Sequence, residues 1–199
     1  MSAADVVIIG SGGANLASLR YALERLGARS EVSTDPARVA AAPRLLLPGV
    51  GAAADAMARL RAAGLIGAIR ALRQPLLGIC LGMQLLYERS EEGDAPCLGL
   101  LEGEVRRIPL TPGRPVPHMG WNTCRLQQPD ALLTGVGDSD YFYFLHSYAA
   151  PATLRSSATV DYGAPLCAVT ASGNFHGVQF HPERSGPAGA RVLRNFLAL

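Results

Sequence analysis

The chain has 199 residues, 49% of them hydrophobic and 17% charged, and this balance excludes an intrinsically disordered protein. The net charge of +2 arises from 18 basic and 16 acidic residues that are mixed along the sequence, so we expect no basic face for nucleic acid. Every basic residue is an arginine, which excludes lysine Schiff-base chemistry and the lysine of a phosphate-binding loop.

The first half of the chain alternates between strand and helix patterns. Short apolar runs predict strands, and leucine or alanine at helical spacing predicts helices. In chain order these are a strand at 6–9, a helix at 15–26, strands at 31–33 and 44–47, a helix at 52–63, a strand at 76–79 and a helix at 81–89. Such alternation favours an α/β fold with a mostly parallel sheet covered by helices on both faces.

The second half contains short strand candidates separated by Gly, Pro and Asp turns, which indicates antiparallel or mixed sheet. These strands are expected at 104–108, 121–126, 141–146, 158–161, 167–171 and 175–180, before a closing helix at 187–199. Alternation within the aromatic strand makes Phe142 and Phe144 core residues. No linker-like stretch is long enough to divide the chain, so we expect one domain over residues 1–199.

A cysteine follows the predicted strand at 76–79, within the stretch Pro75-Leu-Leu-Gly-Ile-Cys80-Leu-Gly-Met-Gln84. The apolar run stops at Cys80, a glycine stands two residues away on either side, and a helix pattern follows. This arrangement is typical of a nucleophile elbow that carries a thiol. Gly78 and Gly82 fit because side chains there would collide with the backbone of so tight a turn. Helix N-terminal N–H groups favour a thiolate, so we expect Cys80 to be reactive.

The stretch Phe175-His-Gly-Val-Gln-Phe-His181-Pro-Glu183 predicts a strand that ends at a histidine, since proline cannot continue the ladder. Glu183 follows closely enough to orient the imidazole of His181. Sites in parallel sheets form at the carboxyl ends of strands. We therefore expect Cys80, His181 and Glu183 to meet as nucleophile, base and orienting carboxylate.

The segment Leu47-Pro-Gly49-Val-Gly51 ends the strand predicted at 44–47. Glycines on both sides of Val50 permit unusual backbone angles, including a peptide that flips. Backbone N–H groups of Gly49, Val50 and Gly51, with that of Leu81, would then form an oxyanion hole beside the thiol. A plain tight turn is the alternative.

Several weaker features leave two interpretations open. The loop Gly10-Ser-Gly-Gly-Ala-Asn15 resembles a dinucleotide-binding turn, but Asn15 stands where the third glycine of that fingerprint belongs. A tight turn that places Asn15 at the functional rim is favoured. Trp121 lies between turn residues and is either a core residue or a partner contact. Glu92 is most simply part of a solvated helix end.

The four cysteines, at positions 80, 97, 124 and 167, have neither disulfide-framework pairing nor metal-site spacing. We therefore expect no metal or other cofactor, and a reducing, cytoplasmic environment. No apolar run reaches the roughly 18 residues of a membrane span, and the N-terminus lacks a signal-peptide pattern.

Together these motifs resemble those of triad-type (class I) glutamine amidotransferases. Gly-Ile-Cys80-Leu-Gly-Met-Gln84 and Gln-Phe-His181-Pro-Glu183 are shared with many members. Leu-Pro-Gly49-Val-Gly51, Pro-His118-Met-Gly-Trp121-Asn122 and the glycine-rich start are similar to the glutaminase subunits of imidazole glycerol phosphate synthase in particular. The resemblance extends over essentially the whole chain. It implies a flavodoxin-like α/β fold with an additional small antiparallel sheet.

The resemblance also implies a reaction and a partner. Cys80 would hydrolyse L-glutamine to glutamate and ammonia, and the ammonia would pass to a separate (β/α)8 cyclase subunit in a heterodimer of histidine biosynthesis. Residues implied to hold the amino-acid end of glutamine are Gln84, Glu92, Ser147 and Tyr148. Residues implied to lie at the subunit interface are Asn15, Trp121, Asn122 and Tyr143.

Three alternatives remain open at this point: a glutaminase subunit of another synthase, a stand-alone thiol hydrolase of γ-glutamyl compounds, and a non-catalytic interaction module. A further hypothesis concerns control, because ammonia released without a loaded partner is lost to water. The flanking glycines make a flip of the Val50 peptide a candidate switch that keeps glutaminase activity low until then.

Overall fold

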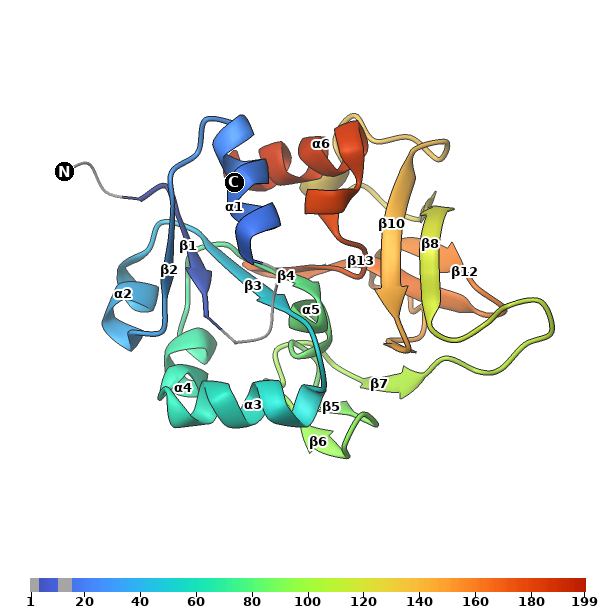
Figure 1. Cartoon of the computed structure of the whole chain (residues 1–199), viewed down its shortest axis with the longest axis horizontal. Helices are drawn as coiled ribbons and strands as arrows, with labels where there is room; N and C mark the ends of the chain where they lie inside the picture. Colours follow the sequence, from blue (N-terminus) through green and yellow to red (C-terminus); the bar gives the residue numbers. More distant parts are fainter. Residues whose placement is uncertain (1–3, 11–15) are drawn as a thin grey trace.

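A computed structural model describes residues 4–10 and 16–199 (Figure 1). Its largest sheet has eight strands in the order β2-β1-β3-β4-β14-β13-β12-β9. The strands from β2 to β14 in this order are parallel to their neighbours, and those from β14 to β9 pair antiparallel. Their bounds are β1 Val6–Ile9, β2 Ser30–Ser33, β3 Leu45–Gly49, β4 Leu76–Cys80, β9 Arg125–Leu126, β12 Ser156–Asp161, β13 Pro165–Ser172 and β14 Phe175–Val178.

Helices cover both faces of this sheet, and the alternation of side chains along the strands explains why. In β1, Val6 and Ile8 pack into one apolar core with α1 and α6, whereas Val7 and Ile9 pack into a second core with α2, α3 and α4. Figure 1 shows α1 and α6 on one side of the sheet and α3 and α4 on the other. The helices are α1 Leu16–Arg25, α2 Pro36–Ala41, α3 Ala53–Ala62, α4 Leu65–Arg70, α5 Leu81–Gln84 and α6 Gly186–Leu197. Fully burying each large apolar side chain of these cores contributes about 1.5–3 kcal/mol.

Two smaller sheets flank the carboxyl edge of the parallel strands. One is an antiparallel hairpin of β8 (His118–Thr123) and β10 (Tyr141–His146). The other has the order β11-β7-β5-β6, with β5 Arg89–Ser90, β6 Ala95–Pro96, β7 Glu104–Arg107 and β11 Tyr148–Ala149. Two short 3-10 helices complete the described elements, η1 at Ala131–Leu133 and η2 at Pro182–Arg184.

The predicted α/β fold with a mostly parallel central sheet and a small additional sheet is confirmed. Phe142 and Phe144 are fully buried, as the alternation predicted. Among the described residues, no helix is both long enough and apolar enough to cross a membrane.

The helix after Cys80 is shorter than predicted. It was expected to reach residue 89, but α5 ends at Gln84. The next carbonyls bond elsewhere: that of Leu85 accepts from the N–H of Leu98, and that of Leu86 accepts from the N–H groups of Leu100 and Leu101. These contacts replace the next helical turn and lead the chain into β5.

Candidate active site

Cys80 lies at the turn between β4 and α5 with a strained backbone. Its φ is 53° and its ψ is −112°, and such a conformation costs a side-chain-bearing residue about 1–3 kcal/mol. The neighbouring glycines make the turn possible. A Cβ on Gly82 would lie 1.6 Å from the carbonyl oxygen of Leu47, and one on Gly78 would lie 2.7 Å from backbone atoms of Gly82. The elbow predicted from the glycine spacing is therefore present.

Neighbouring strands bring three predicted segments to one edge of the sheet. β4 lies between β3 and β14, and Gly49 at the end of β3 is the register partner of Cys80. Val178, the last residue of β14, is the register partner of Ile79. The chain then continues to His181. The thiol, the imidazole and the Gly49 backbone consequently meet at the carboxyl end of the parallel strands.

The side chains of His181 and Glu183 form a direct pair. Nδ1 of His181 lies 2.9 Å from Oε1 of Glu183, and both side chains are about one-tenth exposed. Burial lowers the pKa of His181, but hydrogen bonds with Cys80 and Glu183 outweigh it and raise the pKa above its ordinary value. The imidazole is thereby favoured in its protonated form next to the sulfur.

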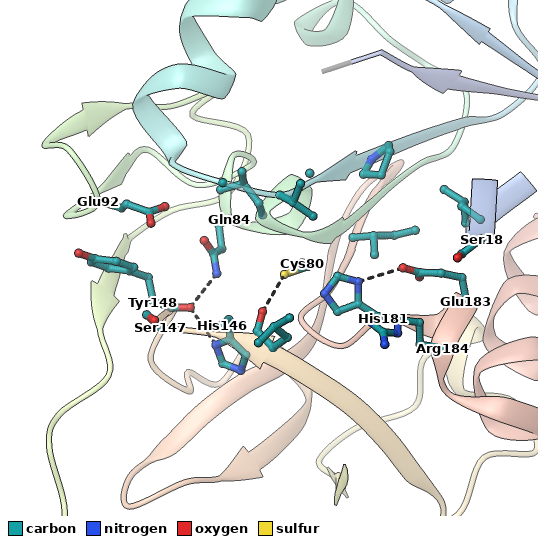
Figure 2. Close-up of a pocket in the computed structure, with 18 residues that line it drawn as sticks. Ser18, Cys80, Gln84, Glu92, His146, Ser147, Tyr148, His181, Glu183 and Arg184 are labelled. Atoms are coloured by element: carbon teal, nitrogen blue, oxygen red, sulfur yellow. Dashed lines mark hydrogen bonds and ion pairs between the residues drawn. The ribbon is translucent and has the colours of Figure 1, made fainter. Parts of the chain in front are cut away.

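One pocket, with a volume of about 240 Å³, is lined by every residue predicted for catalysis, for the oxyanion hole and for substrate binding. Figure 2 shows Cys80 in its middle, with His181 and Glu183 on one side and Gln84, Tyr148 and Glu92 on the other. A ligand that spans the pocket would therefore present one end to the thiol and the other to the carboxylate of Glu92.

Gln84 is anchored rather than free at the floor of the pocket. Its Nε2 donates to the carbonyl oxygen of Tyr148 at 2.7 Å and to Oε1 of Gln179 at 3.1 Å. Ser147 and Tyr148 line the same wall. The backbone between β10 and β11 is therefore held by a buried amide.

Glu92 is not part of a solvated helix end, so that interpretation is wrong. It follows β5, lines the pocket, and accepts a hydrogen bond from the N–H of Ala53 at 3.0 Å. Burial raises the pKa of Glu92, the Ala53 contact lowers it, and the charge of Asp55 raises it. The helix predicted at 81–89, whose solvated end was expected to include Glu92, stops at Gln84, which is why the residue can turn towards the pocket.

The segment predicted as an oxyanion strand lies directly beside the elbow. Gly49, Val50 and Gly51 line the pocket, and Gly51 has a φ of +89°. Gly49 packs so closely on α5 that a Cβ there would lie 3.0 Å from that of Leu81. Leu81 is the first residue of α5, so its N–H has no acceptor within the helix.

Two contacts at the site were not predicted. Gln179, fully buried, places its Nε2 3.7 Å from the Cys80 sulfur. Ser185, also buried, donates to the carbonyl of His181 at 2.7 Å and accepts from the N–H of Tyr143 at 2.9 Å. Gln179 stands within the histidine motif, where an amide between the apolar residues Val178 and Phe180 was the available signal. For Ser185 the sequence carries no signal that we recognise.

Three residues predicted for a partner interface lie on the β8–β10 hairpin. Trp121 and Tyr143 are register partners on its outer face, with ring centroids 5.9 Å apart. The Arg184 guanidinium lies 4.6 Å from the centre of the Tyr143 ring. Asn122 instead turns to the inner face, where its Nδ2 donates to the carbonyl of Asp161 at 3.2 Å.

Asn15 and most of the glycine-rich loop before it lie outside the described residues. The predictions that concern this loop, at the functional rim or as a nucleotide turn, therefore stay predictions. Within the described ranges, no three His, Cys, Asp or Glu side chains gather in a way that could hold a metal ion.

Comparisons with known proteins identify the family to which the chain belongs. Residues 7–199 match the family model "Glutamine amidotransferase class-I". The chain is 54% identical over 195 residues to the imidazole glycerol phosphate synthase subunit HisH of Xanthomonas euvesicatoria pv. vesicatoria (strain 85-10), which covers 98% of both chains. It is 51% identical, with the same coverage, to the HisH subunit of Xylella fastidiosa (strain Temecula1 / ATCC 700964).

Solved structures support the fold. A crystal structure of a glutamine amidotransferase superposes with a TM-score of 0.75 at 22% identity, covering 97% of each chain. A chain in the structure of PurLQS from Thermotoga maritima gives a TM-score of 0.72 at 19% identity, also covering 97% of each chain. The chain described here therefore belongs to the class-I glutamine amidotransferase family and, within it, to the family of imidazole glycerol phosphate synthase HisH subunits.

Proposed function

We propose that this chain is the glutaminase subunit of an imidazole glycerol phosphate synthase. It hydrolyses L-glutamine to glutamate and ammonia and delivers the ammonia to a (β/α)8 cyclase subunit. The cyclase then forms imidazole glycerol phosphate and aminoimidazole carboxamide ribotide in histidine biosynthesis. The observation that carries the proposal is the shared pocket in which Cys80 faces the His181–Glu183 pair, with Gln84 and Glu92 at the opposite end.

The first half of the reaction forms a thioester. The Cys80 thiolate attacks the side-chain amide carbon of glutamine, and the carbonyl π electrons move to oxygen. His181, protonated next to the sulfur, gives its proton to the amide nitrogen. The C–N bond then breaks and ammonia leaves. Glu183 holds the ring in position and stabilises its positive charge through the contact at Nδ1.

The second half regenerates the thiol. Neutral His181 takes a proton from water as the water oxygen attacks the thioester carbon. The C–S bond breaks, glutamate leaves, and the thiolate–imidazolium pair is restored. Backbone N–H groups of Leu81 and of the Gly49–Gly51 segment stabilise the oxyanion in both halves. Loss of one such donor typically costs about 3–4 kcal/mol of transition-state stabilisation.

The far end of the pocket provides recognition of the amino acid. The carboxylate of Glu92 suits the α-ammonium group of glutamine, and the backbone at Ser147 and Tyr148 suits its remaining polar atoms. Gln84 keeps that backbone in place through its contact with the Tyr148 carbonyl. The distance between Glu92 and Cys80 then selects a substrate whose side-chain amide is as far from its α-carbon as that of glutamine.

The outer face of the β8–β10 hairpin is the proposed docking site for the cyclase subunit. Met119 is 66% exposed, Trp121 56% and Tyr141 59%, and Tyr143 lies among them. Exposed apolar and aromatic side chains gathered on one face are typical of protein interfaces. Leu145 belongs to this face and also lines the pocket, so the interface adjoins the site of ammonia release.

The proposal also covers the domain organisation of the chain, its location in the cell and the control of its activity. We propose one amidotransferase domain over residues 1–199 and a cytoplasmic location, which the free cysteines at positions 80, 97, 124 and 167 support. The Gly49–Gly51 segment, with Val50 at the pocket, remains the candidate switch for activation by the loaded partner.

The test is reconstitution. The wild-type chain and its Cys80→Ala variant are mixed with the cyclase, and glutamate release is measured with and without the acceptor nucleotide. We expect hydrolysis by the wild-type complex only, and stimulation by the acceptor. Equal rates for the isolated chain and the loaded complex would refute the control mechanism, and activity of Cys80→Ala would refute the assignment.

A further inference from the structure

Two buried histidines lie on the inner face of the β8–β10 hairpin, and one of them, His146, lines the pocket (Figure 2). His118 and His146 are register partners, and they are 2% and 6% exposed. Nδ1 of His118 lies 3.1 Å from Nε2 of His146. The His118 ring stacks between Phe144 and Tyr162, with centroid distances of 4.7 and 3.9 Å. The two imidazoles are therefore held in fixed orientations by both hydrogen bonding and packing.

The partners of these rings determine where their protons lie. Nδ1 of His146 is 2.9 Å from the carbonyl oxygen of Tyr148, which can only accept, so this nitrogen carries a hydrogen. Nε2 of a neutral His146 then has a lone pair and accepts from Nδ1–H of His118. That leaves Nε2 of His118 as an acceptor, and Nδ2 of Asn122 lies 3.4 Å away. All donors consequently point in one direction, from the hairpin towards Tyr148.

The orientation of the Asn122 amide is set independently. Its Oδ1 accepts from the N–H of Thr123 at 2.9 Å, and its Nδ2 donates to the carbonyl of Asp161 at 3.2 Å. Burial lowers the pKa of His118 to about 4 and that of His146 to about 3. Both rings are thus neutral near pH 7, as this arrangement of donors requires.

The Tyr148 carbonyl joins the histidines to the catalytic side of the pocket. It accepts from His146 and, at 2.7 Å, from Nε2 of Gln84 (Figure 2). Gln84 also donates to Oε1 of Gln179, whose Nε2 lies 3.7 Å from the Cys80 sulfur. A continuous polar path therefore runs from Asn122 on the hairpin to the nucleophile.

We propose that His118 and His146 are positioning residues for glutamine hydrolysis, which hold the Tyr148 carbonyl and so fix the Gln84 amide that is anchored on it. The inference rests on the proposed function and adds a support for its binding pocket that no triad residue provides. Neither histidine exchanges a proton with substrate. Because Asn122 belongs to the hairpin that is proposed to meet the cyclase, the same path connects the partner surface with the site.

The first experiment separates the two ends of the His146 ring. Steady-state kinetics are measured for the complex with the cyclase in the presence of acceptor. In His146→Asn the side-chain amide can still donate to Tyr148, whereas in His146→Gln it lies at the Nε2 position and that contact is lost. We expect the KM for glutamine to rise about tenfold in His146→Gln and to stay within about threefold of wild type in His146→Asn.

A double-mutant cycle tests whether the histidines act as one unit. His118→Phe keeps the ring stack but removes the donor to His146, and we expect a rise in KM of about tenfold. The double variant His118→Phe/His146→Gln should be no worse than His146→Gln alone, since the second change breaks a path that is already broken. Two independent packing defects would instead multiply to about a hundredfold.

Tyr162→Phe is the matched control. Tyr162 also stacks on His118, and the variant loses one partly buried hydrogen bond, from its hydroxyl to the carbonyl of Pro115 at 2.7 Å, which is not part of the path to Tyr148. Its KM should equal that of wild type. An increase in KM as large as that of His146→Gln would reduce the role of the histidines to general packing and overturn the inference.

A measurement on the wild-type protein avoids any variant that fails to fold. Nitrogen-15 spectra of the imidazole rings should show both His118 and His146 neutral, with hydrogen on Nδ1 and none on Nε2. An Nε2–H form on either ring, or wild-type kinetics in His146→Gln and His118→Phe, would overturn the inference and leave the proposed function intact. A wild-type complex without glutaminase activity would instead overturn the proposed function, and the inference with it.

Discussion

The elbow at Cys80 depends on a close approach that only glycine permits, and Gly82→Ala tests this directly. The added Cβ would lie 1.6 Å from the Leu47 carbonyl oxygen and 2.7 Å from its carbonyl carbon. Real Cβ contacts essentially never fall below 3.0 Å, so α5 and β3 must separate by about 1.4 Å. Both obstacles are backbone atoms, so no side-chain rotation relieves the clash.

The separation moves the groups proposed to be catalytic as well as core residues. Leu47 stands two residues before Gly49, and Cys80 two residues before Gly82, so the proposed oxyanion segment and the proposed nucleophile shift relative to each other. Overpacking of this kind typically costs about 1–3 kcal/mol of stability. A displacement of about 1 Å in an active site typically costs about a hundredfold in rate. We therefore expect kcat to fall at least a hundredfold in Gly82→Ala, with a measurable loss of unfolding free energy.

Gly67→Ala is the matched control for this variant. Gly67 lies inside α4, and a Cβ there meets no atom within 4 Å. Replacing a helical glycine by alanine should stabilise the protein by about 0.5–1 kcal/mol and leave kcat unchanged. Urea unfolding and steady-state glutaminase assays measure both quantities. Wild-type activity and stability in Gly82→Ala would show that the elbow does not have the geometry described.

Further variants test other parts of the site. Glu183→Gln keeps the shape of the side chain that orients His181 but removes its charge. We expect kcat in the steady-state glutaminase assay to fall roughly a thousandfold or more. An unchanged kcat would contradict the proposed orienting role of Glu183. Burial gives His118 a pKa of about 4 in the folded protein, against about 6.5 in the unfolded chain. Between these pH values the unfolded chain binds more protons than the folded protein. The free energy of unfolding therefore falls as the pH drops from 6.5 to 4. In urea titrations the wild type should lose about 3 kcal/mol more than His118→Phe across this window, and equal losses would mean that His118 is not buried in its neutral form. Trp121→Ala should weaken cyclase binding about tenfold or more in a calorimetric titration. Val32→Ala, an exposed position on the edge strand β2, should leave the affinity unchanged. Equal affinities for the two variants would place the interface elsewhere.

The sequence patterns that predicted Cys80, His181 and Glu183 as a triad are local, and each of them determines the backbone conformation around its own residue. The glycine frame around Cys80 specifies a tight turn, and the proline after His181 predicts the end of a strand nearby, although β14 already ends at Val178. The rule that sites lie at the carboxyl ends of parallel strands then brings both residues to one edge. A hundred intervening residues do not weaken this reasoning, because it depends on sheet topology rather than on chain distance.

Residues whose roles depend on tertiary contacts were not predictable in the same way. Glu92 was interpreted as part of a solvated helix end because nothing in the sequence shows that bonds from Leu98, Leu100 and Leu101 terminate the helix. The His118–His146 pair depends on hairpin register, and the strand was expected to begin at 121 rather than at His118. Neither register nor the end of a short helix follows from periodicity alone.

Labelling of Cys80 by a glutamine-like electrophile, diazo-oxo-norleucine, tests the central claim most directly. The chain offers internal controls, since burial raises the pKa of Cys97 to about 11, that of Cys124 to about 12, and that of Cys167 as well. Peptide mass spectrometry of the labelled protein should find one adduct per chain, at Cys80 alone, and excess L-glutamine should prevent it. An adduct at another cysteine, or an unmodified Cys80 in a fully inactivated protein, would contradict the assignment of Cys80 as the nucleophile.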